Sequence, residues 1–427
     1  LRMAIDQGDS SALRAFFDRY ERSYVAEKLR ADWIRWLGKR GNWSEIVVEY
    51  PKLLAPEPDV SCYYQQARLA GGYMAALDDA QPLWLTMLEP PEACRAVLDA
   101  LIRENRVTTD DIWARVHRQF EANRTGPAKV TLAALPAGQA PDAKALDMVI
   151  GSPLGYLVKQ PANWSSSQSG RELAALAIQR ISTNDPRAAA LELEKLQGRM
   201  QDAERQWAWS QVGLQAAKRH YAEALDWYAQ GRETPLSDEG AQWKVRAALR
   251  VHDWSVVLAT ISEMPPALAA QPEWVYWLGR AYKAGGLTSE ADALFEKIAG
   301  QANFYGNLAD EELGRKILTP PKAKAPTAEE QKATRDNPAI RRALDFFRLD
   351  MRTEAVREWN WSLRGMDDRE LLAAADLARR NQIWDRAINT ADRTLTQHNF
   401  SLRYIAPFSD RVRPKADELG VGGGGVC

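Results

Sequence analysis

The stretch EWVYWLGRAYKAGGLTSEADALFEKIAG, from Glu273 to Gly300, decides the fold class of this chain. Two segments with apolar residues at helical spacing flank the break KAGGLT at 283–288, where paired glycines favour a turn. The stretch therefore predicts two helices joined by a tight connection. One such hairpin fits many proteins, so its meaning depends on whether similar units recur.

Similar units do recur along the chain. In each, a short polar turn precedes apolar residues that would share one face of a helix. These units are KRHYAEALDWYAQG from Lys218, HDWSVVLATISEMP from His252, DMRTEAVREWNWSL from Asp350 and NQIWDRAINTADRT from Asn381. Strand-like alternation is scarce, and its best example, EIVVEY at 45–50, also fits a helix.

The small and aromatic residues of the first stretch resemble those of tetratricopeptide units. Gly279 and Phe295 fall near positions where a small residue lets two helices approach and an aromatic ring fills the space between neighbours. Recurrent helix pairs that each bury only part of their surface must stack to form a core. We therefore predict an all-α chain, an α-solenoid superhelix of stacked helix pairs that is curved or ring-shaped, followed by a small helical linker domain.

Changes in composition divide the chain. Periodic apolar residues give way to Pro, Ala, Lys and Glu in LTPPKAKAPTAEEQKATRDNP, from Leu318 to Pro338. We predict a superhelical domain at 1–318, a linker segment at 319–338 and a helical linker domain at 339–420. Residues 421–427, VGGGGVC, read as a flexible or artificial tail, because a glycine run favours neither a helix nor a core.

The overall charge excludes some classes of partner. The 427 residues include 56 basic and 57 acidic side chains, for a formal net charge of −1. This balance gives no excess of positive charge of the kind that binds nucleic acid. No apolar run approaches the roughly 20 residues that span a bilayer, so we expect a chain that does not cross the membrane.

Few residues form patterns that are typical of a catalytic, phosphate-binding or metal-binding site. The four histidines, His117, His220, His252 and His398, are not paired at ligand spacing, so no metal site is predicted. No glycine-rich phosphate loop or nucleophile elbow is present, and no pair of carboxylates stands out as acid and nucleophile. We therefore nominate no catalytic residue and no cofactor.

Sixteen tryptophans allow two interpretations. Indole faces can stack on sugar rings, but large aromatic rings also fill the space between packed helices and contribute strongly to burial. The second interpretation is favoured for six of them: Trp33, Trp43, Trp207, Trp254, Trp274 and Trp384. No individual glycan-binding residue is identified.

The three cysteines leave the redox state open. Cys62 and Cys94 flank a segment that contains Trp84, and a bridge between them would remove about 3 to 4 kcal/mol of unfolded-state entropy. Two reduced cysteines of a cytosolic protein are equally compatible with the spacing. Cys427 follows the glycine run and is expected to have no structural role.

An ordered set of segments resembles the non-catalytic part of the soluble lytic murein transglycosylases of Gram-negative bacteria. The resemblance runs from about residue 20 to Gly420. It rests on GNWSEIVVEY, CYYQQARLAGG, PLWLTML, EAC, EWVYWLGRAY, FYGNLADEELG, REWNWSL, LARRNQIWDRAINTAD and LRYIAPFSD, in that order.

The resemblance implies a set of expectations. Residues up to about Leu318 would form the family's superhelical U domain and residues 339–420 its L domain. Cys62 and Cys94 would match a paired cysteine, which would place the chain in the periplasm. The family cleaves the bond between N-acetylmuramic acid and N-acetylglucosamine in cell wall turnover and leaves a 1,6-anhydromuramyl end.

The sequence departs from the family after LRYIAPFSDRVRPKADELG. There the family continues into a lysozyme-like domain, whose first helix carries a catalytic Glu followed by Ser. This sequence reads VGGGGVC instead and contains no Glu-Ser dipeptide. We therefore expect that this polypeptide alone does not cleave murein.

Two functions remain as hypotheses. The first is a scaffold that binds peptidoglycan glycan strands, with other cell-wall proteins as further candidate partners. The alternative is a protein–protein interaction scaffold of tetratricopeptide type, because such surfaces often hold peptides. In LRYIAPF at 402–408, Tyr404 and Phe408 are candidate contacts for a catalytic domain.

Overall fold

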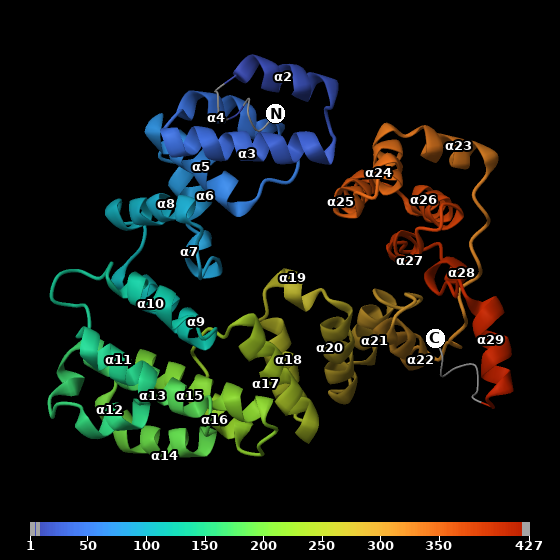
Figure 1. Ribbon diagram of the computed structural model, residues 1–427. Coiled ribbons are helices and arrows are strands. Elements are labelled where there is room, and N and C mark those ends of the chain that lie inside the picture. The colour runs from blue at the N-terminus through green and yellow to red at the C-terminus, as the bar shows by residue number, and fades with distance from the viewer. Residues whose placement is uncertain (1–4, 6–8, 421–427) are drawn as a thin grey trace.

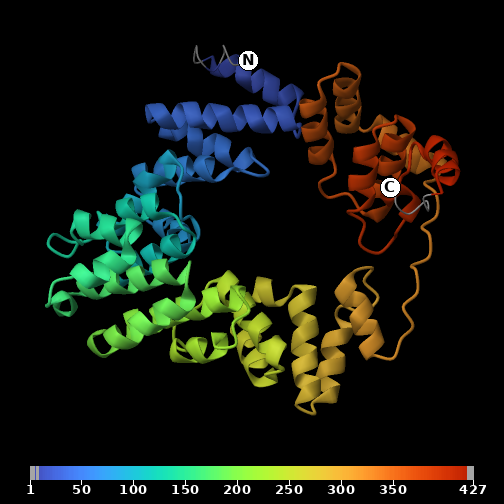
Figure 2. The same ribbon diagram turned by 60° about the horizontal axis from the view of Figure 1, so that its bottom comes forward.

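The chain folds into a ring of helices (Figures 1 and 2). The structure, a computed structural model, describes Ile5 and residues 9–420. In these residues the regular elements are helices, and extended pairing is confined to an isolated parallel bridge between Lys322 and His398. The predicted all-α superhelix is confirmed. The tail at 421–427 lies outside the described residues.

The first arc of the ring, blue to green in Figure 1, contains short helices around the longer α3. Its elements are α2 (Ser10–Arg19), α3 (Tyr24–Arg40), α4 (Trp43–Glu49), η1 (Tyr50–Lys52), α5 (Pro58–Ala70), α6 (Ala76–Ala80), α7 (Leu83–Thr86), α8 (Glu92–Arg103), α9 (Thr109–Glu121), α10 (Thr125–Leu132), α11 (Ala143–Gly151) and α12 (Pro153–Lys159).

The second arc, green to ochre, contains more regular helix pairs. Its elements are η2 (Trp164–Ser166), α13 (Gln168–Ser182), α14 (Pro186–Leu196), η3 (Gln197–Arg199), α15 (Asp202–Lys218), α16 (Ala224–Gln230), α17 (Asp238–Val251), α18 (Trp254–Ser262), α19 (Pro266–Ala269), α20 (Pro272–Ala284), α21 (Thr288–Glu296) and α22 (Phe304–Glu312).

The third arc, orange to red, returns toward the N-terminal helices. Its elements are α23 (Ala328–Asp336), α24 (Pro338–Arg348), α25 (Arg352–Ser362), α26 (Asp368–Arg380), α27 (Trp384–Ala391), α28 (Phe400–Arg403) and α29 (Ser409–Glu418). No helix in the described part of the chain is long and apolar enough to cross a membrane.

The hairpin of α20 and α21 shows why the decisive stretch folds as it does. A Cβ atom on Gly279 would lie 2.6 Å from the ring of Phe295, which is fully buried. Only a glycine lets the two helices approach this closely. Gly213 and Tyr228 repeat the arrangement between α15 and α16, where the added Cβ would lie 2.9 Å from the ring. The expected small and aromatic pairing is therefore confirmed.

The short connections between paired helices share a residue in the left-handed backbone conformation. His252 adopts a left-handed conformation with φ 58° at the end of α17. Asp253 follows and accepts a hydrogen bond from the N–H of Val256, which caps the start of α18. Asp350 and Gln382 have similar φ values of 58° and 60° in the turns before α25 and α27. One left-handed residue therefore reverses the chain in a very short connection.

The core is a series of hydrophobic clusters that follow the ring. One cluster is built on α2 to α5, a large one on α6 to α15, and others on α17 to α22 and on the C-terminal helices. Of the tryptophans interpreted as packing residues, Trp33, Trp207 and Trp274 are buried. Trp43, Trp254 and Trp384 are partly buried. The bulk of the indole surface therefore serves helix packing.

The segment predicted as a linker, 319–338, changes character along its length. It runs extended across the outside of the last arc, and the N–H of Ala323 donates to the carbonyl of His398 over 2.8 Å. It then becomes helical in α23, whose Glu330 forms an ion pair with Arg369 over 2.6 Å. The domain boundaries proposed from the sequence remain a prediction.

Candidate functional site: the closing seam of the ring

The ring closes where α25 meets the start of α3 (Figure 2). Two hydrogen bonds join these segments across the length of the chain. The backbone N–H of Tyr24 donates to Oε2 of Glu358 over 3.2 Å, and Nε1 of Trp361 donates to the carbonyl of Arg22 over 2.9 Å. The indole of Trp361 also meets the ring of Tyr24 edge-on, with centroids 5.8 Å apart. We call this junction the seam.

Glu358 is the electrostatic centre of the seam. Its side chain is fully buried, and Oε1 accepts from Nη2 of Arg342 over 2.8 Å. Its other oxygen accepts from the first turn of α3, where backbone N–H groups lack partners within the helix. The partial positive charge of a helix N-terminus favours a carboxylate there. Glu358 therefore holds α3 by hydrogen bonding and by charge.

A cavity of about 470 Å³ lies directly on the seam. Arg357, Arg364 and Arg393 line it, and none of them pairs with a carboxylate within the described residues. Arg364 stacks on the ring of Trp361 at 3.6 Å, and Arg393 donates to the amide oxygen of Asn360 over 3.2 Å. Guanidinium groups that have no carboxylate partner favour carboxylate or phosphate ligands.

The carboxylates in this cavity have other partners. Glu27 accepts from the N–H groups of Leu54 and Ala55, and Glu57 pairs with Arg35. Their charge is therefore partly engaged away from the three arginines. The seam cavity consequently has the character of an anion site with an aromatic wall.

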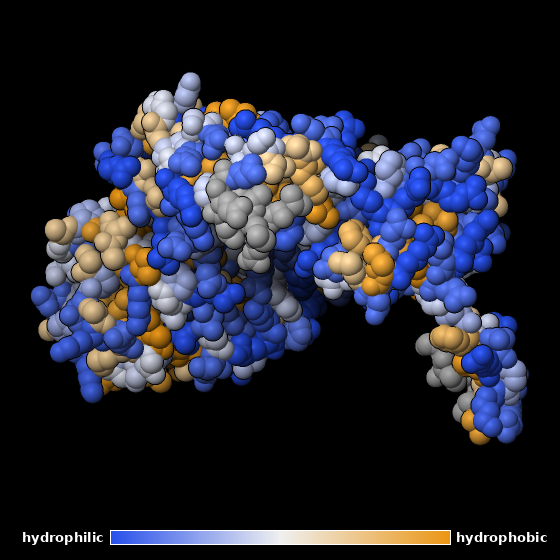
Figure 3. All heavy atoms as spheres, turned by 45° about the horizontal axis from the view of Figure 1, so that its top comes forward, coloured by the Kyte–Doolittle hydropathy of each residue, from blue (hydrophilic) through white to orange (hydrophobic). Residues whose placement is uncertain are grey.

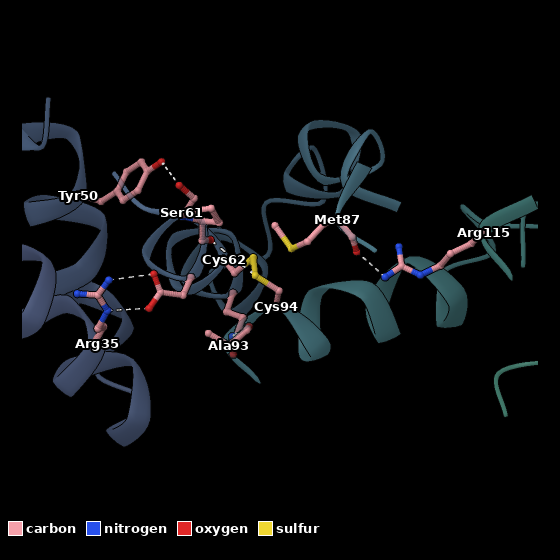
Figure 4. Close-up of a disulfide and its surroundings, with 11 residues drawn as sticks. Arg35, Tyr50, Ser61, Cys62, Met87, Ala93, Cys94 and Arg115 are labelled. Atoms are coloured by element: carbon pink, nitrogen blue, oxygen red, sulfur yellow. Dashed lines mark hydrogen bonds and ion pairs between the residues drawn. A yellow bond between two sulfur atoms is a disulfide. The ribbon is translucent and has the colours of Figure 1, made fainter. Parts of the chain in front are cut away.

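The two internal cysteines lie in the first arc, on two neighbouring helices (Figure 4). Cys62 of α5 and Cys94 of α8 are fully buried, and their Sγ atoms lie 2.05 Å apart in a disulfide bond. The bond joins two helices separated by 32 residues in sequence. It therefore ties α8 to the helices that support α3.

Polar contacts around the disulfide extend this support in both directions (Figure 4). On one side Arg35 of α3 pairs with Asp59 of α5 over 2.7 Å, and this hydrogen bond lowers the pKa of the Asp59 carboxyl. On the other side Arg115 of α9 donates to the carbonyls of Trp84 and Met87. Burial lowers the pKa of Arg115 to about 10.

The candidate docking residues lie elsewhere in the third arc. Tyr404 and Phe408 are 77% and 60% exposed, and they flank the turn between α28 and α29. Figure 3 shows the C-terminal helix standing apart from the body of the molecule, with hydrophobic surface on it. Tyr404 stacks on Phe400 of α28, with centroids 6.2 Å apart. Their role as contacts for a catalytic domain stays a prediction.

Sequence reasoning did not find the seam. Trp361 belongs to the segment REWNWSL, but no local pattern links it to Arg22 or links Glu358 to Tyr24. An acidic residue on a buried helix face was the one available signal, because such a charge requires a partner. Within the described residues, no group of three or more metal-ligating side chains gathers around a common point.

Comparison with known proteins places these features in context. The family model of the soluble lytic murein transglycosylase L domain matches residues 333–394, which include α24 to α27 and therefore Glu358 and Trp361. A search of curated proteins finds no match.

Solved structures match along nearly the whole chain. An inactive mutant of lytic transglycosylase Slt from Pseudomonas aeruginosa is similar over 97% of this chain and 67% of its own, with 25% identity and a TM-score of 0.69. The 70 kDa soluble lytic transglycosylase SLT70 from Escherichia coli covers 98% of this chain and 68% of its own, with 19% identity and a TM-score of 0.59. A complex of the 70 kDa enzyme with bulgecin A matches with the same figures. This chain thus spans about two thirds of the length of each structure.

Proposed function

This chain is of the soluble lytic murein transglycosylase type, and from that premise we propose that it is the non-catalytic, peptidoglycan-binding scaffold region of such an enzyme. The observation that carries the proposal is the likeness to the Pseudomonas aeruginosa lytic transglycosylase over 97% of the chain. The L domain match at 333–394 supports it independently. Cleavage of the bond between N-acetylmuramic acid and N-acetylglucosamine would then occur on another part of the whole enzyme.

The seam cavity supports a direct role in binding. Peptidoglycan carries carboxylate groups on its muramyl peptides, and Arg357, Arg364 and Arg393 offer guanidinium groups to such anions. The stacked pair of Arg364 and Trp361 adds a flat surface for a sugar ring or an amide. We propose that glycan strands contact the ring at this cavity, where a bound strand would touch both sides of the seam.

A periplasmic location follows from the same proposal. A buried disulfide is stable in an oxidising compartment and is rare in the cytosol. Cys62 and Cys94 form such a bond, which supports the periplasm as the place of action.

Co-sedimentation with purified sacculi tests the proposed function. We expect saturable binding that a soluble muropeptide competes away, without anhydro products in mass spectra of the released material. Release of anhydromuropeptides by the purified chain would show that it has its own catalytic activity. Capture of a specific protein partner with no affinity for sacculi would favour the alternative scaffold for protein–protein interaction.

A charge variant tests the seam cavity itself. The double substitution Arg357→Ala and Arg364→Ala should weaken sacculus binding by about tenfold and reduce its dependence on salt, because two charge-assisted contacts are lost. The control is Arg103→Ala with Arg232→Ala, which removes the same charge from exposed positions outside the cavity. Equal losses in both variants would refute a specific role for the seam cavity.

A further inference from the structure

A second cavity, of about 600 Å³, lies between α9, α13, α15 and the segment before α17. These elements are neighbours where the first arc of the ring meets the second (Figure 1). The cavity is rich in carboxylates, which come from all four elements. They are Asp110, Glu121, Glu172, Asp202, Glu204 and Glu233.

Several of these carboxylates are engaged within the protein. Glu172 lies 2.6 Å from Nε2 of His117, whose ring stacks on Trp207 with centroids 3.9 Å apart. Glu233 accepts from the side-chain amide of Gln206 over 2.9 Å. These contacts connect the helices around the cavity, so helix packing accounts for them without a ligand.

Two buried acceptor atoms of residues that line the cavity have no such contact. Glu204 is 2% exposed, and while its Oε1 accepts from Nε of Arg171 over 2.9 Å, its Oε2 has no hydrogen-bond partner within the described chain. Gln211 is 3% exposed, and while its Nε2 donates to Glu121, its Oε1 also lacks a partner there. Both residues line the cavity.

Buried acceptors of this kind favour a ligand that donates hydrogen bonds. Leaving such a group unpaired costs free energy, and the cost is larger for a carboxylate oxygen than for an amide oxygen. Glu204 and Gln211 lie seven residues apart on α15, so they occupy the same face of the helix two turns apart. The axial rise between them is about 10 Å, so a ligand that serves both acceptors needs two separate donor groups.

The charge of the lining selects among donors. Of the six carboxylates, Glu204 pairs with Arg171, Asp202 with Arg205 and Glu233 with Arg232. Asp110 and Glu121 have no ion pair within the described chain, and Arg118, which lines the cavity, donates to the carbonyl of Leu236 over 3.1 Å. A neutral polyol would satisfy the acceptors but bring no positive charge to Asp110 and Glu121, whereas a cationic donor would. Leu85 also lines the cavity and is 43% exposed, so it offers apolar contact beside the polar groups.

We propose that this cavity, which we call the acidic cavity, binds the primary ammonium group of a peptide side chain. The ammonium has three donors and a compact positive charge, which suit Oε2 of Glu204, while an amide N–H of the same peptide suits Oε1 of Gln211. The alkyl stem of such a side chain packs along Leu85. The site is independent of the seam cavity, and it does not depend on glycan binding.

A matched pair of small probes tests the proposal by calorimetry. Nα-acetyl-L-lysine N-methylamide carries the ammonium group, and its Nε-acetyl form has the same skeleton without the charge. We expect binding of the first that weakens with salt, and affinity for the second at least about tenfold lower. Equal affinity for both probes, or no heat from either, would overturn the proposal.

Variants locate the binding in the acidic cavity. In Glu204→Gln the amide oxygen can still accept from Arg171, while an NH₂ group replaces Oε2, so affinity for the charged probe should fall about tenfold or more. If that variant does not fold, the double variant Asp202→Asn with Glu233→Gln takes its place, since both positions are exposed at the cavity rim. Its affinity for the charged probe should also fall. Unchanged affinity in the folded variant would place any binding elsewhere and refute the site.

A control and a second arm complete the experiment. Glu194→Gln with Asp226→Asn removes two exposed carboxylates outside the cavity and should leave affinity unchanged. A short peptide with one lysine, measured free and attached to a muropeptide, then distinguishes a peptide source of the ammonium group from a glycan-linked one. Because the first probe contains no sugar, failure of sacculus binding and failure of this site are separate results.

Discussion

Oε2 of Glu358 accepts a hydrogen bond from the backbone N–H of Tyr24, 334 residues earlier in the chain. One carboxylate therefore pairs with Arg342 in its own domain and with the N-terminus of α3 across the seam. The indole of Trp361 makes a parallel contact to Arg22. The two ends of the helical array are joined by a few specific polar contacts.

The first prediction concerns the seam. Trp361→Phe removes the hydrogen bond to Arg22 and should lower the free energy of unfolding by about 1 kcal/mol, because the carbonyl loses its donor. Glu358→Gln removes the negative charge that holds the start of α3, so this variant should open the ring. Small-angle scattering should then show a larger radius of gyration. Trp36→Phe on α3 is the control, since its Nε1 has no partner in the described chain. An unchanged radius and unchanged stability would show that these contacts do not hold the ring.

The second prediction concerns the close approach of α20 and α21. Gly279→Ala should destabilise the fold by about 1 to 3 kcal/mol, because the new Cβ would overlap the buried ring of Phe295. Gly285→Ala is the matched control, since its nearest contact would be an ordinary 3.4 Å. Urea denaturation of both variants measures the difference. Similar midpoints would mean that the ring of Phe295 moves aside without cost.

The third prediction concerns the disulfide. Closing a loop between residues 32 apart should stabilise the fold by about 3 to 4 kcal/mol, since the bond restricts the unfolded chain. Thermal melting with and without reductant tests this, and the double variant Cys62→Ala with Cys94→Ala should melt like the reduced protein. A variant that still responds to reductant would point to a thiol other than this pair.

The fourth prediction concerns acid stability. Burial raises the pKa of Asp368, but hydrogen bonds from the N–H groups of Leu395, Gln397 and Thr396 outweigh it and hold the pKa well below its usual range. Because the folded pKa is depressed, this stabilisation is complete above the unfolded pKa of about 4 and is lost as pH falls below that value. Asp368→Asn should therefore lower the melting temperature at pH 7.

The pH profile provides the check. The gap in melting temperature between the wild type and Asp368→Asn should narrow as the pH falls from 5 to 2. Asp226→Asn, at an exposed position on α16, should show a constant and small gap over the same range. A gap that stays constant for Asp368→Asn would mean that its carboxylate is not the titrating group.

Much of the fold could be predicted from the sequence because it is local. The approach of Gly279 to Phe295 joins residues that lie 16 positions apart, and the same pattern of helix, short turn and helix recurs with each unit. The capping of α18 by Asp253 is local as well. Such features follow from backbone preferences and helical spacing, which a short window of sequence contains.

The candidate site could not be predicted in the same way. Glu358 and Tyr24 become neighbours only after the small rotations between successive units add up around the whole array. The same holds for the acidic cavity, where Glu204 of α15 meets residues of α9 and of the segment before α17. Nothing in the local sequence around Arg357 or Gln211 specifies which distant elements will face them.

Closure at the seam has a consequence for how the chain tolerates insertions and deletions. An open stack can gain or lose a repeat at an internal position, because the rest of the array simply shifts along. The present molecule instead closes on itself, so the circumference of the ring fixes the number of helix pairs that it contains. Removing one pair, such as α17 with α18, would displace α25 from the start of α3 by the width of a helix hairpin, so the length of the array is constrained by its own two ends.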